Sequence, residues 1–512
     1  MTGQTTPTAS TVLRGRLLRG GALLLVGKGV TQGASFLRNV IVARVVGVEN
    51  FGIAATFAIM IYIFDMLGSL SVDKLLIQAK DGNDERFQSV AHALQAVRGM
   101  GTGLLIFVCA PLMAYLFGVP QATWAFRWLA LVPVLRGFAH LDNQRVQRDL
   151  KFRGAVVLEV AQQLIPTLVA WPLAVWTHDY SAMLWLVLLQ TAVATGGSFF
   201  VAERPYRWHW DGTYVKRFLG FGWPLIANAV LMFGIYQGDR FLIGTAGRTI
   251  GSHVYTLKDL GIYSVATSLT LTPMVAFANI CGPLMLPLFA AKQTQPAELH
   301  QHYAISTQLV GLLSGFFALP LIIAGMLIVT TIYGQAYAPA GAIIGWMAAG
   351  QAVRMARFAP SMSAMALGDT TNAMYSNLLR FAALAPILGV IAFGGALRWI
   401  AMFGFCGEVL GLVVCLWKLE RDHRIPALDA IKSAVALLTI MGMAGLTVTY
   451  FTYVGAIAAS LLLSAFLIVF FVAVMAIFPS LRNFIRVEAA LILGRRPRPG
   501  LGVRHPTVPA VE

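Results

Sequence analysis

The chain has 512 residues, of which 58% are hydrophobic and only 12% charged, and its mean hydropathy is +0.72. Because a soluble globular domain carries roughly 25% charged residues, this composition excludes an ordinary soluble protein. The net charge of +16 does not indicate nucleic-acid binding, since most cations lie in short loops where they act as topology signals. We predict an all-α polytopic membrane protein with no nucleic-acid partner.

Apolar stretches of about 20 residues, the length that crosses a hydrocarbon core of about 30 Å, recur along the whole chain. They predict about 14 transmembrane helices. The weakest is 122–140, because Arg127 and Arg136 lie inside it. The predicted spans are 18–43, 51–71, 91–117, 122–140, 154–176, 181–201, 218–242, 260–289, 303–330, 340–366, 372–394, 396–417, 432–453 and 455–478.

The distribution of Lys and Arg predicts the orientation of these spans. The tails and loops on the N-terminal side of the membrane hold 25 such residues, and those on the opposite side hold five. This asymmetry predicts that both termini are cytoplasmic and that the chain crosses the membrane an even number of times. Anionic lipid headgroups are the expected partners of these loop cations.

A short motif occurs twice and predicts an internal repeat. Phe51-Gly52-Ile53 opens the second span and Leu260-Gly261-Ile262 opens the eighth, with Gly47 and Gly247 ending the preceding helices. We predict two six-helix lobes related by this repeat, plus two extra C-terminal helices. The predicted parts are an N-terminal tail (1–17), an N-lobe (18–201), a linker (202–217), a C-lobe (218–417), a loop with spans 13 and 14 (418–478), and a basic cytoplasmic tail (479–512). Within that tail, residues 480–493 have the pattern of a short helix lying on the inner leaflet.

Polar residues inside the spans are the candidate functional residues, because a charge at membrane depth is costly and usually faces a cavity or a partner. In the first span, Lys28, Gln32, Ser35 and Asn39 follow the spacing i, i+4, i+7, i+11 and share one helix face, with Arg38 to one side. In the tenth span, Arg354 and Arg357 share one helix face with Gln351 and Ser361. The resulting candidate substrate-binding residues are Lys28, Arg38, Arg354, Arg357 and Arg380.

Two interpretations of these charges stay open. A cavity with excess cations suits an anionic substrate such as a phosphate or pyrophosphate, since Arg offers a planar fork for phosphate oxygens. Alternatively the charges pair with one another or extend to the interface, as we expect for Arg127 and Arg136. The carboxylates Asp65, Glu159 and Glu408 are candidates either for ion or proton coupling or for ion pairing. For Asp239 and Arg240 we expect a local ion pair.

No motif indicates catalysis or a cofactor. The chain lacks a Walker A loop, a dinucleotide fingerprint and a cluster of metal-ligating residues, and its four cysteines have no metal-ligand spacing. No loop is long enough to fold as a separate catalytic domain. We therefore predict neither an enzyme nor a cofactor.

The segment Ala43-Arg44-Val-Val-Gly47-Val-Glu49-Asn-Phe51-Gly52-Ile53, with Leu76-Ile77-Gln78 after it, resembles the bacterial polysaccharide transporter family. These are the Wzx-type flippases of the multidrug/oligosaccharidyl-lipid/polysaccharide exporter superfamily. The stretch from Asp239 to Gly244, followed by Leu260-Gly261-Ile262-Tyr263, is also similar to that family. The resemblance covers roughly residues 18–420, and the chain departs from it at 249–257 and in its basic tail.

The resemblance implies two six-helix lobes around a central cavity, which opens alternately to the two sides of the membrane. The expected cargo is a polyprenyl-pyrophosphate-linked glycan, an undecaprenyl-linked repeat unit moved to the outer leaflet for exopolysaccharide, capsule, O-antigen or lipopolysaccharide synthesis. Expected partners are a polysaccharide polymerase and chain-length proteins. The alternatives are a multidrug or cation exporter of the same superfamily and a membrane glycosyltransferase, polymerase or ligase. A lipid-II-type flippase is a close variant of the main interpretation.

Overall fold

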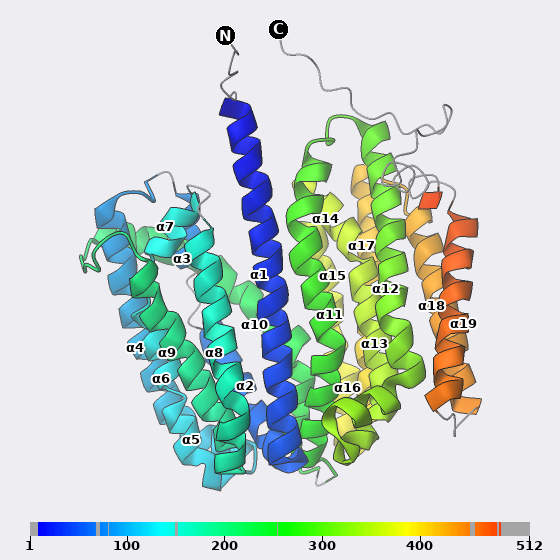
Figure 1. Ribbon diagram of the computed structural model, residues 1–512, viewed down its shortest axis with the longest axis horizontal. Coiled ribbons are helices and arrows are strands. Elements are labelled where there is room, and N and C mark those ends of the chain that lie inside the picture. Colours follow the sequence, from blue (N-terminus) through cyan, green and yellow to red (C-terminus); the bar gives the residue numbers. More distant parts are fainter. Residues whose placement is uncertain are drawn as a thin grey trace, which may run out of the picture. The chain divides into compact units, whose positions relative to one another are not determined.

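The computed structural model describes residues 9–67, 72–79, 81–148, 152–252, 254–450, 456–478 and 481–482. All the regular secondary structure in these ranges is helical, which confirms the predicted all-α class (Figure 1). Nine helices within the described ranges are long and apolar enough to cross a membrane. The chain is therefore an integral membrane protein, while the count of 14 spans stays a prediction.

The helices follow one another with short connections. Their bounds are α1 (Ala9–Val46), α2 (Val48–Leu67), α3 (Val72–Gln78), α4 (Glu85–Leu116), η1 (Pro120–Ala122), α5 (Thr123–Trp128), α6 (Leu131–Gly137), α7 (Asp142–Arg148), α8 (Arg153–Thr177), α9 (Ser181–Val201), α10 (Gly212–Thr249), α11 (Leu257–Ala290), α12 (Pro296–Tyr333), η2 (Gln335–Ala340), α13 (Gly341–Ala356), α14 (Phe358–Ala366), α15 (Thr371–Ala382), α16 (Leu384–Ala392), α17 (Leu397–His423), α18 (Leu428–Tyr450) and α19 (Ala456–Ile477).

These helices overlap the predicted spans, and several of them are longer than predicted. Helix α9 has the predicted bounds, and α8 differs by one residue at each end. Helix α1 begins at Ala9, so it extends into the predicted N-terminal tail. The predicted surface helix at 480–493 and the basic tail lie outside the described residues, apart from residues 481–482.

Three predicted spans are each divided into two helices, and proline explains all three divisions. Pro133, Pro360 and Pro386 are each the third residue of the second helix, in α6, α14 and α16. A proline has no N–H to donate to the carbonyl four residues earlier, and its ring crowds that carbonyl. The first helix of each pair therefore ends at or one residue before that carbonyl, and the polypeptide restarts in a new helix.

The described contacts divide the chain into two compact units, which we treat separately. Unit 1 comprises Met1–Ile280, Met326–Ile343 and Arg380–Gly404, and unit 2 comprises Cys281–Gly325, Ile344–Leu379 and Phe405–Glu512. These units do not share the boundaries of the predicted lobes. The division into two six-helix lobes stays a prediction.

In unit 1, the first helix packs along α8, α8 packs on α9, and α4 packs on α5 and α6 (Figure 1). In unit 2, polar bonds join α15 to α17. Asn372 Nδ2 donates to the carbonyl of Cys415 at 2.9 Å, and Ser376 Oγ donates to the carbonyl of Gly411 at 2.7 Å. Because all four groups are buried away from water, these bonds fix the register of the two helices.

A buried carboxylate joins α4, α7 and the loop after α9 in unit 1. Asp142, the first residue of α7, is fully buried and accepts hydrogen bonds from Arg145 Nε at 2.6 Å and Gln88 Nε2 at 3.2 Å. It also accepts from the backbone N–H groups of Glu203 at 2.8 Å and Arg204 at 3.2 Å. These bonds, led by the one from Arg145, hold the pKa of Asp142 well below its usual range despite burial.

We expect Asp142→Asn to lower the free energy of unfolding by about 3 kcal/mol at pH 7, because it removes the charge that Arg145 neutralises. A carboxylate with a lowered pKa stabilises the fold above its unfolded pKa and loses this contribution as pH falls through its folded pKa. The stability gap between wild type and variant should thus stay constant down to about pH 4 and narrow below it. Thermal unfolding in detergent measures this gap, and a gap that widens on acidification would contradict the assignment.

Candidate functional site

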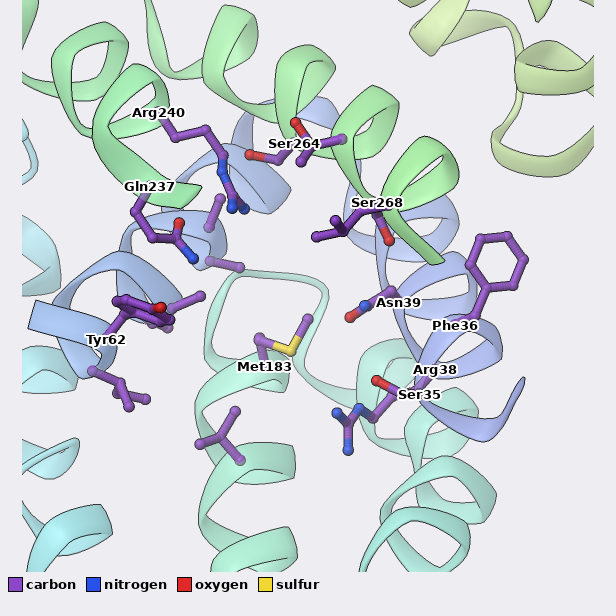
Figure 2. A pocket seen from close by; sticks show the side chains of 18 of the residues that line it. Ser35, Phe36, Arg38, Asn39, Tyr62, Met183, Gln237, Arg240, Ser264 and Ser268 are labelled. Carbon is purple, nitrogen blue, oxygen red and sulfur yellow. The ribbon is translucent and has the colours of Figure 1, made fainter. Parts of the chain in front are cut away.

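The candidate site is a polar cavity of about 520 Å³ that lies wholly within unit 1. Helices α1, α2, α9, α10 and α11 supply most of its wall (Figure 2). Its volume lies in the range of small-molecule sites, about 300–1,000 Å³. Its polar lining residues are Gln32, Ser35, Arg38, Asn39, Tyr62, Asp65, Arg136, Gln190, Gln237, Arg240, Ser264, Thr267, Ser268 and Thr272.

The predicted polar face of α1 supplies one side of this cavity. Gln32, Ser35 and Asn39 line it as the helical spacing predicts, and Arg38 lines it too. Figure 2 shows Arg38 and Asn39 directed toward the cavity. The fourth member of the predicted stripe, Lys28, does not line the cavity.

Arg38 is the buried cation of this wall, with 6% of its surface exposed. Its Nη1 donates to Gln190 Oε1 of α9 at 2.7 Å, whereas its Nε has no hydrogen-bond partner in the described structure. An unsatisfied buried donor is costly, and a functional ligand is one explanation for keeping it. Arg38 therefore carries hydrogen-bonding capacity toward the cavity.

The opposite wall contains polar residues that were not predicted as site residues. Gln237 and Arg240 of α10 and Ser264 of α11 line the cavity and face the α1 side chains (Figure 2). Among the described atoms, Gln237 Oε1, Arg240 Nε and Ser264 Oγ are buried without a hydrogen-bond partner. Together with Arg38, the cavity offers two guanidinium groups, an amide oxygen and a hydroxyl with unused hydrogen-bonding capacity.

The neighbourhood of Arg240 differs from the predicted local ion pair with Asp239. The Arg240 guanidinium donates from Nη2 to the carbonyl of Tyr236 at 2.9 Å. The Asp239 carboxylate instead accepts from the backbone N–H of Arg240 at 2.8 Å and from the Tyr263 hydroxyl at 2.6 Å. These bonds direct Asp239 toward α11 and leave the guanidinium of Arg240 at the cavity wall.

Two of the predicted coupling carboxylates form ion pairs in unit 1. Asp65 pairs with Arg136 of α6, and both residues line the cavity. Glu159 of α8 pairs with Lys28 of α1, and neither lines it. Of these two ion pairs, the Asp65–Arg136 pair lies at the cavity and the Lys28–Glu159 pair joins α1 to α8.

In unit 2 the predicted arginines of the tenth span meet the third carboxylate. Arg354 Nε donates to Glu408 Oε1 at 2.8 Å, and Arg357 Nη2 lies 3.4 Å from Glu408 Oε2. Arg357 also donates to the Ser376 hydroxyl. All three charged residues are at most 9% exposed. In these bonds two arginines share one carboxylate, and a substrate role for the arginines stays a proposal.

The last predicted cation, Arg380, belongs to unit 1 and lies outside the cavity lining. Its guanidinium carbon is 5.9 Å from the centroid of the Tyr236 ring, a distance at which the cation is attracted to the ring face. Tyr236 is adjacent to Gln237 on α10, so Arg380 lies close behind the cavity wall.

Residues 41–342 match the profile of a family described as "Polysaccharide biosynthesis protein". The chain belongs to this family. Among its relatives, the succinoglycan biosynthesis transport protein ExoT of Rhizobium meliloti is 22% identical over 289 residues. That alignment covers 56% of this chain and 57% of ExoT, so the chain spans little more than half of that relative. The predicted resemblance to polysaccharide transporters is confirmed at the level of the family.

The fold is shared with solved transporters. The lipid II flippase MurJ in an inward closed conformation superposes with a TM-score of 0.69 at 14% identity, covering 89% of this chain and 99% of MurJ. An inward-facing conformation of a multidrug resistance MATE family transporter of the MOP superfamily gives a TM-score of 0.61 at 13% identity, covering 77% of this chain and 95% of that transporter. These TM-scores show that the chain has a fold like those of MurJ and this MATE transporter.

Proposed function

We propose that this chain is a flippase that moves an undecaprenyl-pyrophosphate-linked oligosaccharide from the inner to the outer leaflet of the bacterial inner membrane, by alternating access. The observation that carries the proposal is the polar cavity of unit 1. Arg38 and Arg240 line opposite walls of this cavity, and the Nε atom of each has no hydrogen-bond partner among the described atoms. Arginine forks suit the oxygens of a pyrophosphate. Family membership and the transport protein ExoT support the polysaccharide part of the proposal.

Arg38 and Arg240 are the residues we assign to the pyrophosphate, and Gln237 and Ser264 to sugar hydroxyls. Lys28, Arg354, Arg357 and Arg380 are proposed to add to the positive field that attracts the headgroup rather than to contact it. Both termini are proposed to be cytoplasmic, and a polymerase and chain-length proteins to receive the product. Asp65, beside Arg136 at the cavity, is the carboxylate best placed for ion coupling.

We expect Arg38→Gln to reduce export at least tenfold while the folded protein still reaches the membrane, because the variant removes a cavity cation but keeps a polar side chain. The host lacking the gene is complemented with each variant, and undecaprenyl-pyrophosphate-linked saccharides are measured by mass spectrometry. Complete repeat units should accumulate. Arg127→Gln is the matched control, since Arg127 is exposed on α5 and outside the cavity.

Other outcomes distinguish the rival functions. A truncated lipid-linked glycan in the gene deletion would indicate a transferase, polymerase or ligase. An unchanged lipid-linked pool would indicate a multidrug or cation exporter, the function of the MATE neighbour. The rival exporter is less well supported, because its cationic cargo suits a carboxylate-rich cavity, and this cavity holds three arginines and one aspartate.

A further inference from the structure

A second site in unit 1 lies along α10, beside the polar cavity. It is a groove of about 360 Å³ between α10 and the segment formed by the end of α15 and α16. Every residue that lines it is apolar, including Val230, Phe233 and Phe241 of α10 and Leu384, Ala385 and Leu388 of α16. Val230 and Leu388 are about half exposed, at 48% and 44%, so the groove is open along one side.

The composition and length of the groove restrict its occupant. A sugar or a phosphate would lose its hydrogen bonds to water there without replacement, which is unfavourable. The lining residues of α10 run from Val230 to Leu242, about 18 Å along the helix axis at 1.5 Å per residue. This length is more than half of a hydrocarbon core of about 30 Å, so an extended hydrocarbon chain fits the groove.

The same two turns of α10 form a wall of both sites. Gln237 and Arg240 face the polar cavity, while their neighbours Gly238 and Phe241 face the apolar groove. One aromatic contact also joins the two walls: Tyr62, which lines the cavity, lies with its ring centroid 6.1 Å from that of Phe233, which lines the groove. The two sites therefore adjoin each other along α10.

We propose that the groove binds the polyprenyl tail of the substrate whose pyrophosphate occupies the polar cavity. This inference rests on the proposed function. A lipid-linked pyrophosphate has a polar head bonded directly to a branched hydrocarbon chain, so it needs a polar site and an apolar site at one depth and within short reach. Tyr62 and Phe233 are in ring contact where the two sites adjoin, so the link between head and tail passes these two rings.

The test is a pair of tryptophan substitutions on α16 in the full chain in lipid nanodiscs. Ala385→Trp fills the groove from an exposed position, and Ala392→Trp places the same side chain at an exposed position seven residues further, outside the lining. We expect Ala385→Trp to weaken binding of undecaprenyl pyrophosphate about tenfold, because several buried methylene contacts are lost. Binding of inorganic pyrophosphate should change less than twofold, and Ala392→Trp should change neither.

Photo-cross-linking identifies which lipid occupies the groove. Undecaprenyl pyrophosphate with a diazirine on its tail should label the peptide that contains residues 230–242. Excess unlabelled undecaprenyl pyrophosphate should abolish this labelling, whereas excess phosphatidylethanolamine should not. Equal competition by phosphatidylethanolamine would show an ordinary lipid site and overturn the inference.

The same binding measurements distinguish failure of this inference from failure of the proposed function. If wild type binds inorganic pyrophosphate in an Arg38-dependent manner but Ala385→Trp binds the long-chain lipid normally, the groove assignment alone is wrong. If wild type binds neither inorganic pyrophosphate nor undecaprenyl pyrophosphate, the proposed function is wrong, and the groove assignment with it.

Discussion

Replacing Gly52 with alanine should lower the free energy of unfolding by about 3 kcal/mol or more and abolish export, although only one methyl group is added. Gly52 lies in the first turns of α2, where a Cβ would be 1.9 Å from the carbonyl oxygen of Leu257, the first residue of α11. Gly261 makes the reciprocal approach, since its Cβ would be 2.3 Å from the carbonyl oxygen of Val48. Both obstacles are backbone atoms, so no side-chain rotation relieves the overlap.

Thermal unfolding and folded yield in detergent test this effect against a second glycine. Gly101 of α4 has no atom within 4 Å of the Cβ position, and alanine is favoured over glycine in a helix by about 1 kcal/mol. Gly101→Ala should therefore unfold at the wild-type temperature or above it. If Gly52→Ala unfolded at the wild-type temperature as well, the close crossing of α2 and α11 would be wrong.

This crossing adds a physical meaning to the motif noticed in the sequence. The two glycines occupy equivalent positions of the proposed repeat, and they face each other at the crossing of their helices in unit 1. Both positions are glycine because the two helix backbones are in contact there and leave no room for a Cβ atom. The sequence could show that the motif recurs, but it could not show that the two copies meet.

The helices themselves could be predicted well because the bilayer constrains them so strongly. A segment that crosses lipid must satisfy its backbone internally and present apolar side chains, and both requirements leave a signal in hydropathy. The predicted span 181–201 and helix α9 thus have the same bounds. The breaks within three spans were not predicted, although Pro133, Pro360 and Pro386 can be seen in the sequence. The spans were predicted from hydropathy, and hydropathy does not depend on whether a residue has a backbone N–H to donate.

The partners of the polar residues could not be predicted for a different reason. Lys28 and Glu159 are 131 residues apart, and no local pattern relates them. Their pairing depends on the packing of α1 on α8, which only the folded chain specifies. The periodicity of α1 nevertheless predicted a polar face, and three of its four residues line the cavity.

Arg240 was missed because the end of its helix was placed too early. The predicted span ended at residue 242, which made Arg240 a terminal residue with an adjacent aspartate. Helix α10 continues to Thr249, nine residues or about 13 Å beyond Arg240. Arg240 is thereby an internal residue of a long helix, at the cavity wall. The extra turns are polar, so hydropathy alone assigned them to a loop.

Replacing Glu408 with alanine should destabilise unit 2 by about 3–5 kcal/mol, the cost of removing the carboxylate from a buried ion cluster. Arg354 and Arg357 both donate to Glu408, and all three side chains are at most 9% exposed. Without this carboxylate, two buried guanidinium groups face each other at close range. Folded yield and thermal unfolding in detergent measure the effect.

Two further substitutions separate the structural role of this cluster from a role in transport. Glu408→Gln keeps the hydrogen-bond acceptor but removes the charge, so its stability should lie between those of wild type and Glu408→Ala. Arg357→Met keeps the hydrogen bonds from Arg354 to Glu408 and should unfold close to wild type. If Arg357 also attracts the anionic cargo, export per folded molecule must still fall in Arg357→Met. Unchanged export in that stable variant would limit Arg357 to a structural role in unit 2 and remove it from the residues proposed to attract the headgroup.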